Sequence, residues 1–194
     1  MRTATVTRNT KETQITVTVA LDGKGGSDIA TGIGFFDHML TALSRHSGIS
    51  MTIHADGDLH VDGHHTVEDT GIVLGQALMQ ALGNKSGIAR YGSAYIPMDE
   101  ALSFCALDLS NRPFLVFQGE FTNQMIGNYD ACLTEEFFRA VAENAGITLH
   151  LNMCYGKNDH HKCEALFKAF AHALKAAVKE NTDGAVLSTK GVLA

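Results

Sequence analysis

Apolar and polar positions follow a regular order along the first half of the chain. Alternation over residues 14–21 has the period of two that predicts a half-buried strand, and residues 50–54 predict another. Residues 36–46 carry apolar side chains at helical spacing, and Gly48 follows them as a helix-ending glycine. A further helix is expected to begin at the motif His-His-x-x-Glu of residues 64–68.

The second half repeats this order of elements. Strands are predicted over residues 101–109, 114–117 and 148–152. A helix is predicted over residues 134–144 and is ended by Gly146, and the motif His-His-x-x-Glu occurs again at residues 160–164. The helix opened by this second motif carries apolar residues at helical spacing, namely Ala165, Phe167, Ala169, Phe170, Ala173, Leu174 and Ala177.

The two motifs indicate an internal duplication. Each follows another histidine by ten residues, at His54 in the first half and at His150 in the second. We therefore divide the single domain into two pseudo-symmetric halves, residues 1–92 and 93–194. Strands mixed with two helices in each half predict an α+β fold, in which each half is a β-sheet covered on one face by two helices.

Composition and charge narrow the class of protein. The chain has 194 residues, of which 45% are hydrophobic and 19% charged, as in globular domains. A formal net charge of −6 argues against nucleic acids and membrane surfaces as partners, because it offers their phosphates no basic face. The polar start lacks the apolar core of a signal peptide, and no apolar run approaches the ~18 residues of a membrane helix. The four cysteines lack CxxC spacing and are expected to be free thiols in the reducing cytoplasm.

A helix that opens with His-His-x-x-Glu can bind metal ions. Residues four apart share a helix face, so His64 lies beside Glu68, whereas the adjacent His65 diverges by about 100° around the axis. Two such helices supply four histidines and two glutamates, and His38 and His150 are the additional donors. Imidazole and carboxylate ligands suit a divalent metal such as manganese, iron or zinc.

A single histidine pair is more often a polar surface feature than a metal site, but its repetition with the glutamate at the same offset favours metal binding. Nearby aspartates are expected to orient the ligand imidazoles by hydrogen bonds. These are Asp37, Asp62, Asp69 and Asp159. The remaining histidines lack such support and are expected on the surface or in packing; they are His46, His54, His60 and His172.

Seven motifs occur in register along nearly the whole chain, from residue 8 to residue 191. They are GIGFFDHML, DGHHTVEDTGI, GIARYG, IPMDEAL, LDLSNRP, GKNDHHKCEALFKAFAHAL and STKG. Together they resemble the imidazoleglycerol-phosphate dehydratase family. The resemblance implies half-domains related to the second domain of ribosomal protein S5, and the dehydration of imidazole glycerol phosphate to imidazole acetol phosphate in histidine biosynthesis. It also implies two manganese ions per active site and a shell of 24 subunits with the active sites between them.

The resemblance assigns roles to individual residues. The implied metal ligands are His38, His64, His65, Glu68, His150, His160, His161 and Glu164. The implied substrate-binding residues are Glu12, His38 and His64, with Arg90, Arg112, Lys168, Ser188 and Lys190 for the phosphate. Glu12 matches a glutamate that the family places near the substrate, and it is the expected general acid or base.

One position departs from the family pattern. Many members have a histidine where this chain has Glu136. Either Glu136 replaces an imidazole by a carboxylate, or this position binds no metal and His150 does. We expect His150 to be the ligand.

The implied reaction removes a proton from a carbon that no carbonyl group activates. Metals at both ring nitrogens would stabilise the substrate's imidazolate, whose electrons expel the hydroxyl and leave a diazafulvene-type intermediate. Loss of a proton then gives an enol, which becomes the ketone. A dinuclear-metal hydrolase and a metal-storage assembly without catalysis are the alternative functions.

Overall fold

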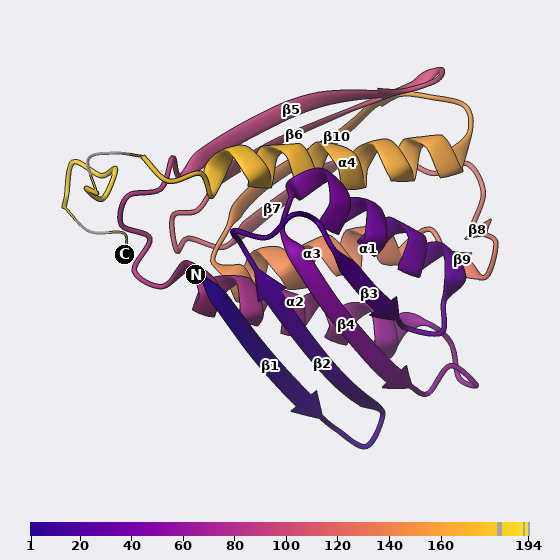
Figure 1. The fold of residues 1–194 in the computed structure, drawn as a ribbon. Helices are drawn as coiled ribbons and strands as arrows, with labels where there is room; N and C mark the ends of the chain where they lie inside the picture. Colours follow the sequence, from indigo (N-terminus) through magenta and orange to yellow (C-terminus); the bar gives the residue numbers. More distant parts are fainter. Residues whose placement is uncertain (182–183, 192, 194) are drawn as a thin grey trace.

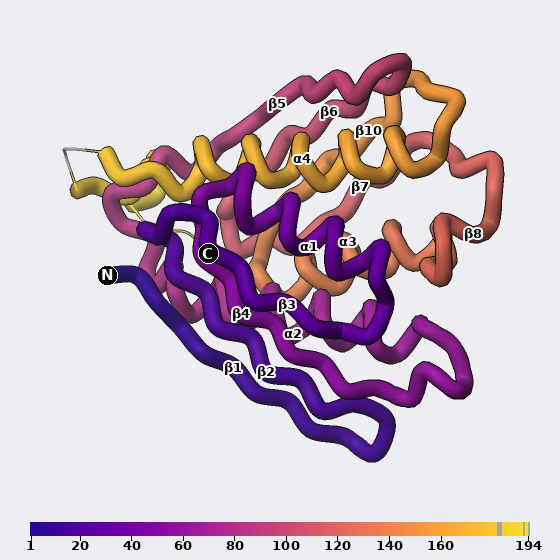
Figure 2. Tube along the Cα trace, turned by 45° about the vertical axis from the view of Figure 1, so that its right-hand side comes forward, coloured from indigo at the N-terminus to yellow at the C-terminus, as the bar shows by residue number. Residues whose placement is uncertain are grey.

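Two four-stranded sheets face each other across a layer of helices in the computed structural model of the chain, which describes residues 1–181, 184–191 and 193 (Figure 1). Each sheet turns one face toward the helices and the other away from them. Figure 2 shows the same layers after a turn of the molecule, with the helices again between the sheets.

The first sheet has the strand order β1-β2-β4-β3. The elements of this half are β1 (Thr3–Asn9), β2 (Thr13–Ala20), β3 (Ser27–Ala30), α1 (Gly34–Ser47), β4 (Ser50–Gly57) and α2 (His64–Leu82). β2 pairs antiparallel with β1 and β4, whereas β3 runs parallel to β4. Ile15, Val17 and Val19 are buried on β2, and the residues between them form the open face of this sheet.

The second sheet has the equivalent order β5-β6-β10-β7. The elements of this half are β5 (Tyr91–Met98), β6 (Ala101–Asp108), β7 (Phe114–Gln118), β8 (Met125–Ile126), β9 (Tyr129–Asp130), α3 (Leu133–Ala145), β10 (Thr148–Tyr155) and α4 (Asp159–Ala177). β6 pairs antiparallel with β5 and β10, and β7 runs parallel to β10. The α+β prediction of two duplicated half-domains is therefore confirmed.

The helix ends follow from the glycines that the sequence places there. Gly48 and Gly146 adopt the left-handed conformation, with φ of 75° and 63°, directly after α1 and α3. The predicted strands and helices all form. The edge strands β1, β3 and β5 were not predicted: β3 has only four residues, and β1 and β5 form as strands by pairing with β2 and β6.

The two halves share one core because their helices pack crosswise, α1 against α4 and α2 against α3. Gly71 and Gly75 allow the close approach of α2 to α3, since a Cβ atom at either position would lie within 3 Å of α3. Aromatic rings also cross the boundary: Phe36 of the first half stacks on Tyr129 of the second. Among the described residues, no helix is long and apolar enough to cross a membrane.

Candidate metal and active site

Three metal-donor groups from the two halves meet at the start of α4. His38 projects from α1, and His160 and Glu164 project from the first turns of α4. Their ligand atoms all lie within 4.8 Å of one another. Glu164 Oε2 lies 3.1 Å from His160 Nε2 and 3.5 Å from His38 Nε2. Two imidazole nitrogens and one carboxylate oxygen thus converge without any rearrangement of the backbone.

Glu164 is the buried member of this cluster, with 7% of its surface exposed. Its second oxygen, Oε1, lies 2.7 Å from Lys168 Nζ, one helical turn further along α4. Burial raises the pKa of the Glu164 carboxyl, but the hydrogen bond and the charge of Lys168 outweigh this effect, so that the net shift is downward. The carboxylate is therefore held in the ionised form in which it can bind a cation.

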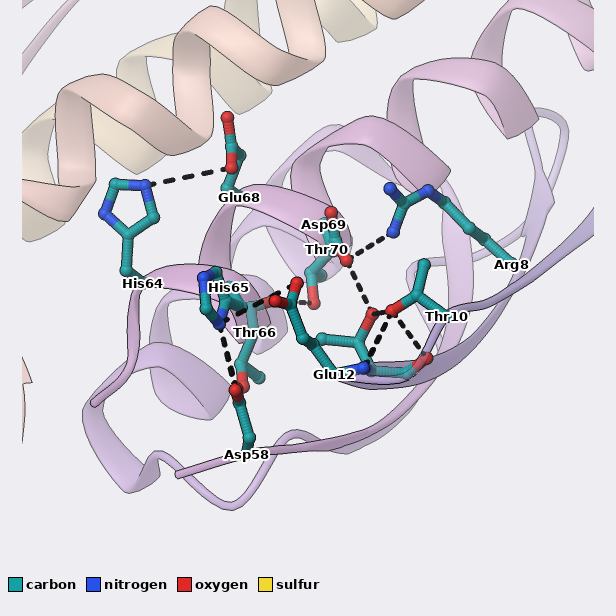
Figure 3. A network of polar contacts seen from close by, with 11 residues as sticks. Arg8, Thr10, Glu12, Asp58, His64, His65, Thr66, Glu68, Asp69 and Thr70 are labelled. Carbon is teal, nitrogen blue, oxygen red and sulfur yellow. Dashed lines mark hydrogen bonds and ion pairs between the residues drawn. The ribbon is translucent and has the colours of Figure 1, made fainter. Parts of the chain in front are cut away.

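A second and less complete donor group lies at the start of α2. His64 Nε2 and Glu68 Oε2 are 3.7 Å apart on one face of the helix (Figure 3). The neighbouring helix α3 carries Glu136 in its first turn, where it lies 3.5 Å from Arg139. Glu136 precedes Gly146 by ten residues, just as His38 precedes Gly48. Because α2 packs against α3 as α4 packs against α1, Glu136 takes the place that His38 has in the first cluster.

His150 lies away from both donor groups. It sits in the middle of β10, opposite Ala106 and Val116, and its neighbours Leu149 and Leu151 are buried toward the helices. Its side chain consequently belongs to the open face of the second sheet. The structure of the chain therefore gives no support to the expectation that His150, and not Glu136, completes the second site.

The second histidine of each motif diverges from the first, as predicted. His64 lies beside Glu68 and His160 beside Glu164 on the same helix, whereas His65 and His161 contact carboxylates that come from other parts of the chain. His65 Nδ1 lies 3.0 Å from Asp58 Oδ2, and His161 Nδ1 lies 2.8 Å from Glu100 Oε2.

The carboxylate partners of His65 and His161 change the proton affinity of both rings. The hydrogen bond to Asp58 raises the pKa of His65, and the hydrogen bond to Glu100 raises the pKa of His161. The pKa of Glu100 falls to about 2, because the main-chain N–H of Asn158, the ring of His161 and the N–H of Lys157 all donate to it. The Glu100 carboxylate is thus an acceptor fixed by the start of α4.

Asp58 and Glu100 were not predicted as partners of these imidazoles, and the prediction that four other aspartates orient the rings is wrong. Those four residues accept hydrogen bonds from other groups: Asp37 from Thr31, Asp62 from the main-chain N–H of His64, Asp69 from Arg8 and Thr13, and Asp159 from Thr122, Asn123 and Lys162. Closeness in sequence suggested them, whereas the actual partners come from a strand end and a hairpin turn. The motif IPMDEAL contains Glu100 and was the available signal.

Glu12 lies in the turn between β1 and β2, close to His65. Its Oε2 atom is 4.0 Å from His65 Nδ1, and 57% of its side chain is exposed (Figure 3). Thr10 Oγ1 accepts the N–H groups of Glu12 and Thr13, and Asp58 donates its N–H to the Glu12 carbonyl oxygen. The turn is therefore fixed while the Glu12 carboxylate stays accessible.

The predicted phosphate-binding residues divide between two places. Arg90, Arg112, Ser188 and Lys190 line a cavity of about 730 Å³ beside the C-terminal segment. Lys168 is not among them, because it lies beside Glu164. Within the cavity, Asp108 accepts Nε and Nη2 of Arg90 at 2.6 and 2.9 Å, which leaves the more exposed Arg112 freer to meet an anion.

The cavity and the cluster of His38, His160 and Glu164 lie at opposite ends of α4. Arg90 donates its main-chain N–H to the carbonyl of Ala177, the last residue of α4, whereas His160 is in the first turn. At a rise of 1.5 Å per residue these ends are about 25 Å apart. A small substrate cannot reach both groups of residues within one chain.

The unsupported histidines lie outside the clusters, as expected. His46 and His172 pack between α1 and α4, with Nδ1 of His46 3.3 Å from Nε2 of His172. Burial lowers the pKa of His46, as do the charges of Lys168 and the His172 ring. His54 is exposed and pairs with Asp28 at 3.1 Å on the open face of the first sheet.

Comparison with known proteins identifies the family of the chain. The family model described as imidazoleglycerol-phosphate dehydratase matches residues 31–174. Proteins of that name from Listeria welshimeri and Bacillus cereus are 59% and 57% identical over 194 residues, and each alignment covers 100% of both chains. The crystal structure of the Staphylococcus aureus dehydratase is 42% identical with a TM-score of 0.84, covering 92% of this chain and 99% of that one. The Pyrococcus furiosus structure is 37% identical with a TM-score of 0.84, covering 97% and 100%. The chain belongs to the imidazoleglycerol-phosphate dehydratase family.

Proposed function

We propose that the protein dehydrates D-erythro-imidazole-glycerol phosphate to imidazole-acetol phosphate in histidine biosynthesis. Membership of the family supports the reaction, because the relatives that match over the full length carry this name. The observation that supports the chemistry is the cluster of His38, His160 and Glu164, whose donor atoms converge within 4.8 Å. A substrate that carries an imidazole ring with two nitrogens suits a protein in which this type of donor group occurs twice.

The donor sets fit manganese. Each consists of imidazole nitrogens and a carboxylate, a combination that binds divalent first-row metals and leaves positions open. We propose that two ions are held by His38, His64, His65, Glu68, His160, His161 and Glu164, with Glu136 in the position that corresponds to His38 in the second donor group. When bound, the ions would supply Lewis-acid stabilisation of the negative charge on the substrate's imidazole ring.

The chain's own residues would supply proton transfer and phosphate binding. Glu12 is exposed at a fixed turn beside His65, so its carboxylate can take a proton from the substrate carbon and deliver one to the departing hydroxyl. Arg112, Ser188 and Lys190 offer a guanidinium, a hydroxyl and an ammonium group around one cavity, which suits a phosphate dianion.

The active site would form between subunits of a 24-subunit shell. The separation of about 25 Å along α4 between the phosphate-binding cavity and the metal donors supports a shared site. In such an assembly the cavity of one subunit meets the donor cluster of another. Nε2 of His65 would then complete a metal shell with donors that its own subunit does not bring to it.

A direct test is to incubate the purified, manganese-loaded protein with imidazole glycerol phosphate and to measure the ketone product. Glu12→Gln is expected to lower kcat by at least about 100-fold while manganese content stays at the wild-type level. Absence of the ketone would refute the dehydratase, and release of inorganic phosphate would identify a hydrolase. Full turnover by the Glu12→Gln protein would refute the role of Glu12.

The assembly is tested separately by native mass spectrometry. The mass is expected to be that of 24 subunits with manganese and of smaller oligomers after chelation. Conversion of His64 and His160 to alanine together should empty at least one metal position by elemental analysis. A monomer in the presence of manganese would refute the shared site.

A further inference from the structure

Each of the two outer imidazoles, His65 and His161, is held through Nδ1 by a carboxylate. Asp58 Oδ2 lies 3.0 Å from His65 Nδ1, and Glu100 Oε2 lies 2.8 Å from His161 Nδ1 (Figure 3 shows the first pair). An ionised carboxylate only accepts hydrogen bonds, so each Nδ1 must carry the hydrogen. Each ring therefore presents Nε2 as its free donor atom.

The two carboxylates come from different parts of the duplicated unit. Glu100 directly precedes β6 in the β5–β6 turn, and its counterpart in the first half is Glu12, which directly precedes β2 in the β1–β2 turn. Glu100 holds the ring of its half, whereas Glu12 Oε2 lies 4.0 Å from His65 Nδ1, beyond hydrogen-bonding distance. The same hairpin position thus anchors a ring in one half and leaves a free carboxylate in the other.

Asp58 explains this difference between the halves. It directly follows Gly57, which pairs with Thr13, the residue after Glu12. In the second half Tyr155 pairs with Leu102, two residues after Glu100, so the corresponding position is Lys157 and carries no carboxylate. Asp58 also donates its N–H to the Glu12 carbonyl oxygen at 3.1 Å, so one residue fixes both the turn and the ring. Only 15% of the Asp58 side chain is exposed, against 57% for Glu12.

We propose that Asp58 and Glu100 are positioning residues that orient His65 and His161 with Nε2 toward the metal, and that Asp58 thereby frees Glu12 for proton transfer. The inference rests on the proposed function for the identity of the metal. Carboxylates that hold a ligand imidazole in this way contribute about 10- to 100-fold to metal affinity.

The first test measures the affinity of the metal-free protein for manganese by competition with a chelator. Asp58→Asn and Glu100→Gln are each expected to weaken binding by about 10- to 100-fold. Asp28→Asn is the matched control, because it removes a carboxylate 3.1 Å from His54 on the open face of the sheet. The manganese affinity of Asp28→Asn should equal that of the wild type. Asp58→Glu should recover most of the affinity that Asp58→Asn loses.

A second measurement separates orientation from general stability. Solid-state ¹⁵N NMR of the metal-free protein, labelled at histidine, should show the Nδ1–H tautomer of His65 and its loss in Asp58→Ala, which has no acceptor for that hydrogen. In that variant kcat should fall more than KM rises, because Glu12 is drawn toward the released ring.

Neither affinity nor tautomer requires substrate, so these results stand apart from the test for the ketone. Manganese affinities of Asp58→Asn and Glu100→Gln equal to that of Asp28→Asn would overturn the proposal. It would also be overturned by a wild-type protein that binds no manganese, or by a His65 ring that keeps its Nδ1–H tautomer in Asp58→Ala.

Discussion

Lys85 provides a sharp test of the electrostatics of this fold. It lies in the connection between the two halves and is only 1% exposed. Its Nζ donates to Asn111 Oδ1 and, at 3.5 Å, to the carbonyl of Ala145 at the end of α3. Burial lowers the pKa of Lys85 from 10.5 to about 8, and the attraction of Asp108 offsets only part of this effect.

The sign of the resulting pH dependence follows from proton binding. Below pH 8 the lysine is charged in both the folded and the unfolded protein, and the folded protein bears the desolvation penalty. Between pH 8 and 10.5 the folded protein releases the proton while the unfolded chain keeps it, so the free energy of unfolding rises with pH. A difference of 2.5 pKa units (10.5 minus 8) corresponds to about 3 kcal/mol, of which roughly 2 to 3 kcal/mol should appear by pH 10.

The measurement is urea unfolding of the wild type and of Lys85→Met at pH 7, 8, 9 and 10, at one protein concentration so that any contribution of the proposed assembly is the same throughout. Subtracting the two curves removes the titration of all other groups. The free energy of unfolding of the wild type, minus that of Lys85→Met, should rise by roughly 2 to 3 kcal/mol between pH 7 and 10. The exposed Lys175, replaced by methionine, should give a flat difference. A flat or falling difference for Lys85 would refute the assignment of a penalised buried cation.

Three further predictions concern packing, metal binding and thiol reactivity. Gly71→Ala should lower the free energy of unfolding by about 1–3 kcal/mol because its Cβ would lie 2.8 Å from the α3 backbone. Gly34→Ala, whose Cβ meets nothing within 4 Å, should change it by less than about 1 kcal/mol. Glu136→Ala should weaken manganese binding more than His150→Ala, since Glu136 on α3 occupies the place that His38 has on α1. If elemental analysis shows the greater loss of manganese in His150→Ala, His150 is the ligand and Glu136 is not. Under native conditions a thiol reagent should modify no more than two of the four cysteines, because Cys105 and Cys163 are buried. Burial raises the pKa of both of these thiols, that of Cys163 to about 12. Modification of a third cysteine would contradict this burial.

The elements of the fold were predictable wherever a local pattern decides them. β2 alternates buried and open residues, and α4 repeats apolar residues at helical spacing, so each reveals its type within a short window. The strands β1 and β3 were missed because pairing with β2 and β4, and not their own composition, makes them strands. Edge strands depend on a neighbour that a sequence window does not contain.

The site was predictable as a set of chemical types and not as a set of partners. The divergence of His64 and His65 follows from helix geometry alone, and the structure has it. The partner of His65 is Asp58, which reaches the ring only because β4 ends beside the start of α2. Such a contact depends on the course of the chain between two elements, and spacing in the sequence does not encode it.

The crosswise packing of the helices makes each donor group depend on both halves of the chain. The first cluster takes His38 from α1 of one half and Glu164 from α4 of the other, so neither half has a complete donor set by itself. Each half has a hairpin glutamate beside its outer ring, and Glu100 contacts His161 at 2.8 Å. In the first half Asp58 holds the equivalent ring, and Glu12 Oε2 lies 4.0 Å from His65 Nδ1. Pseudo-symmetry therefore accounts for the repeated donor groups. The local departure from it at Asp58 accounts for the free carboxylate of Glu12 beside them.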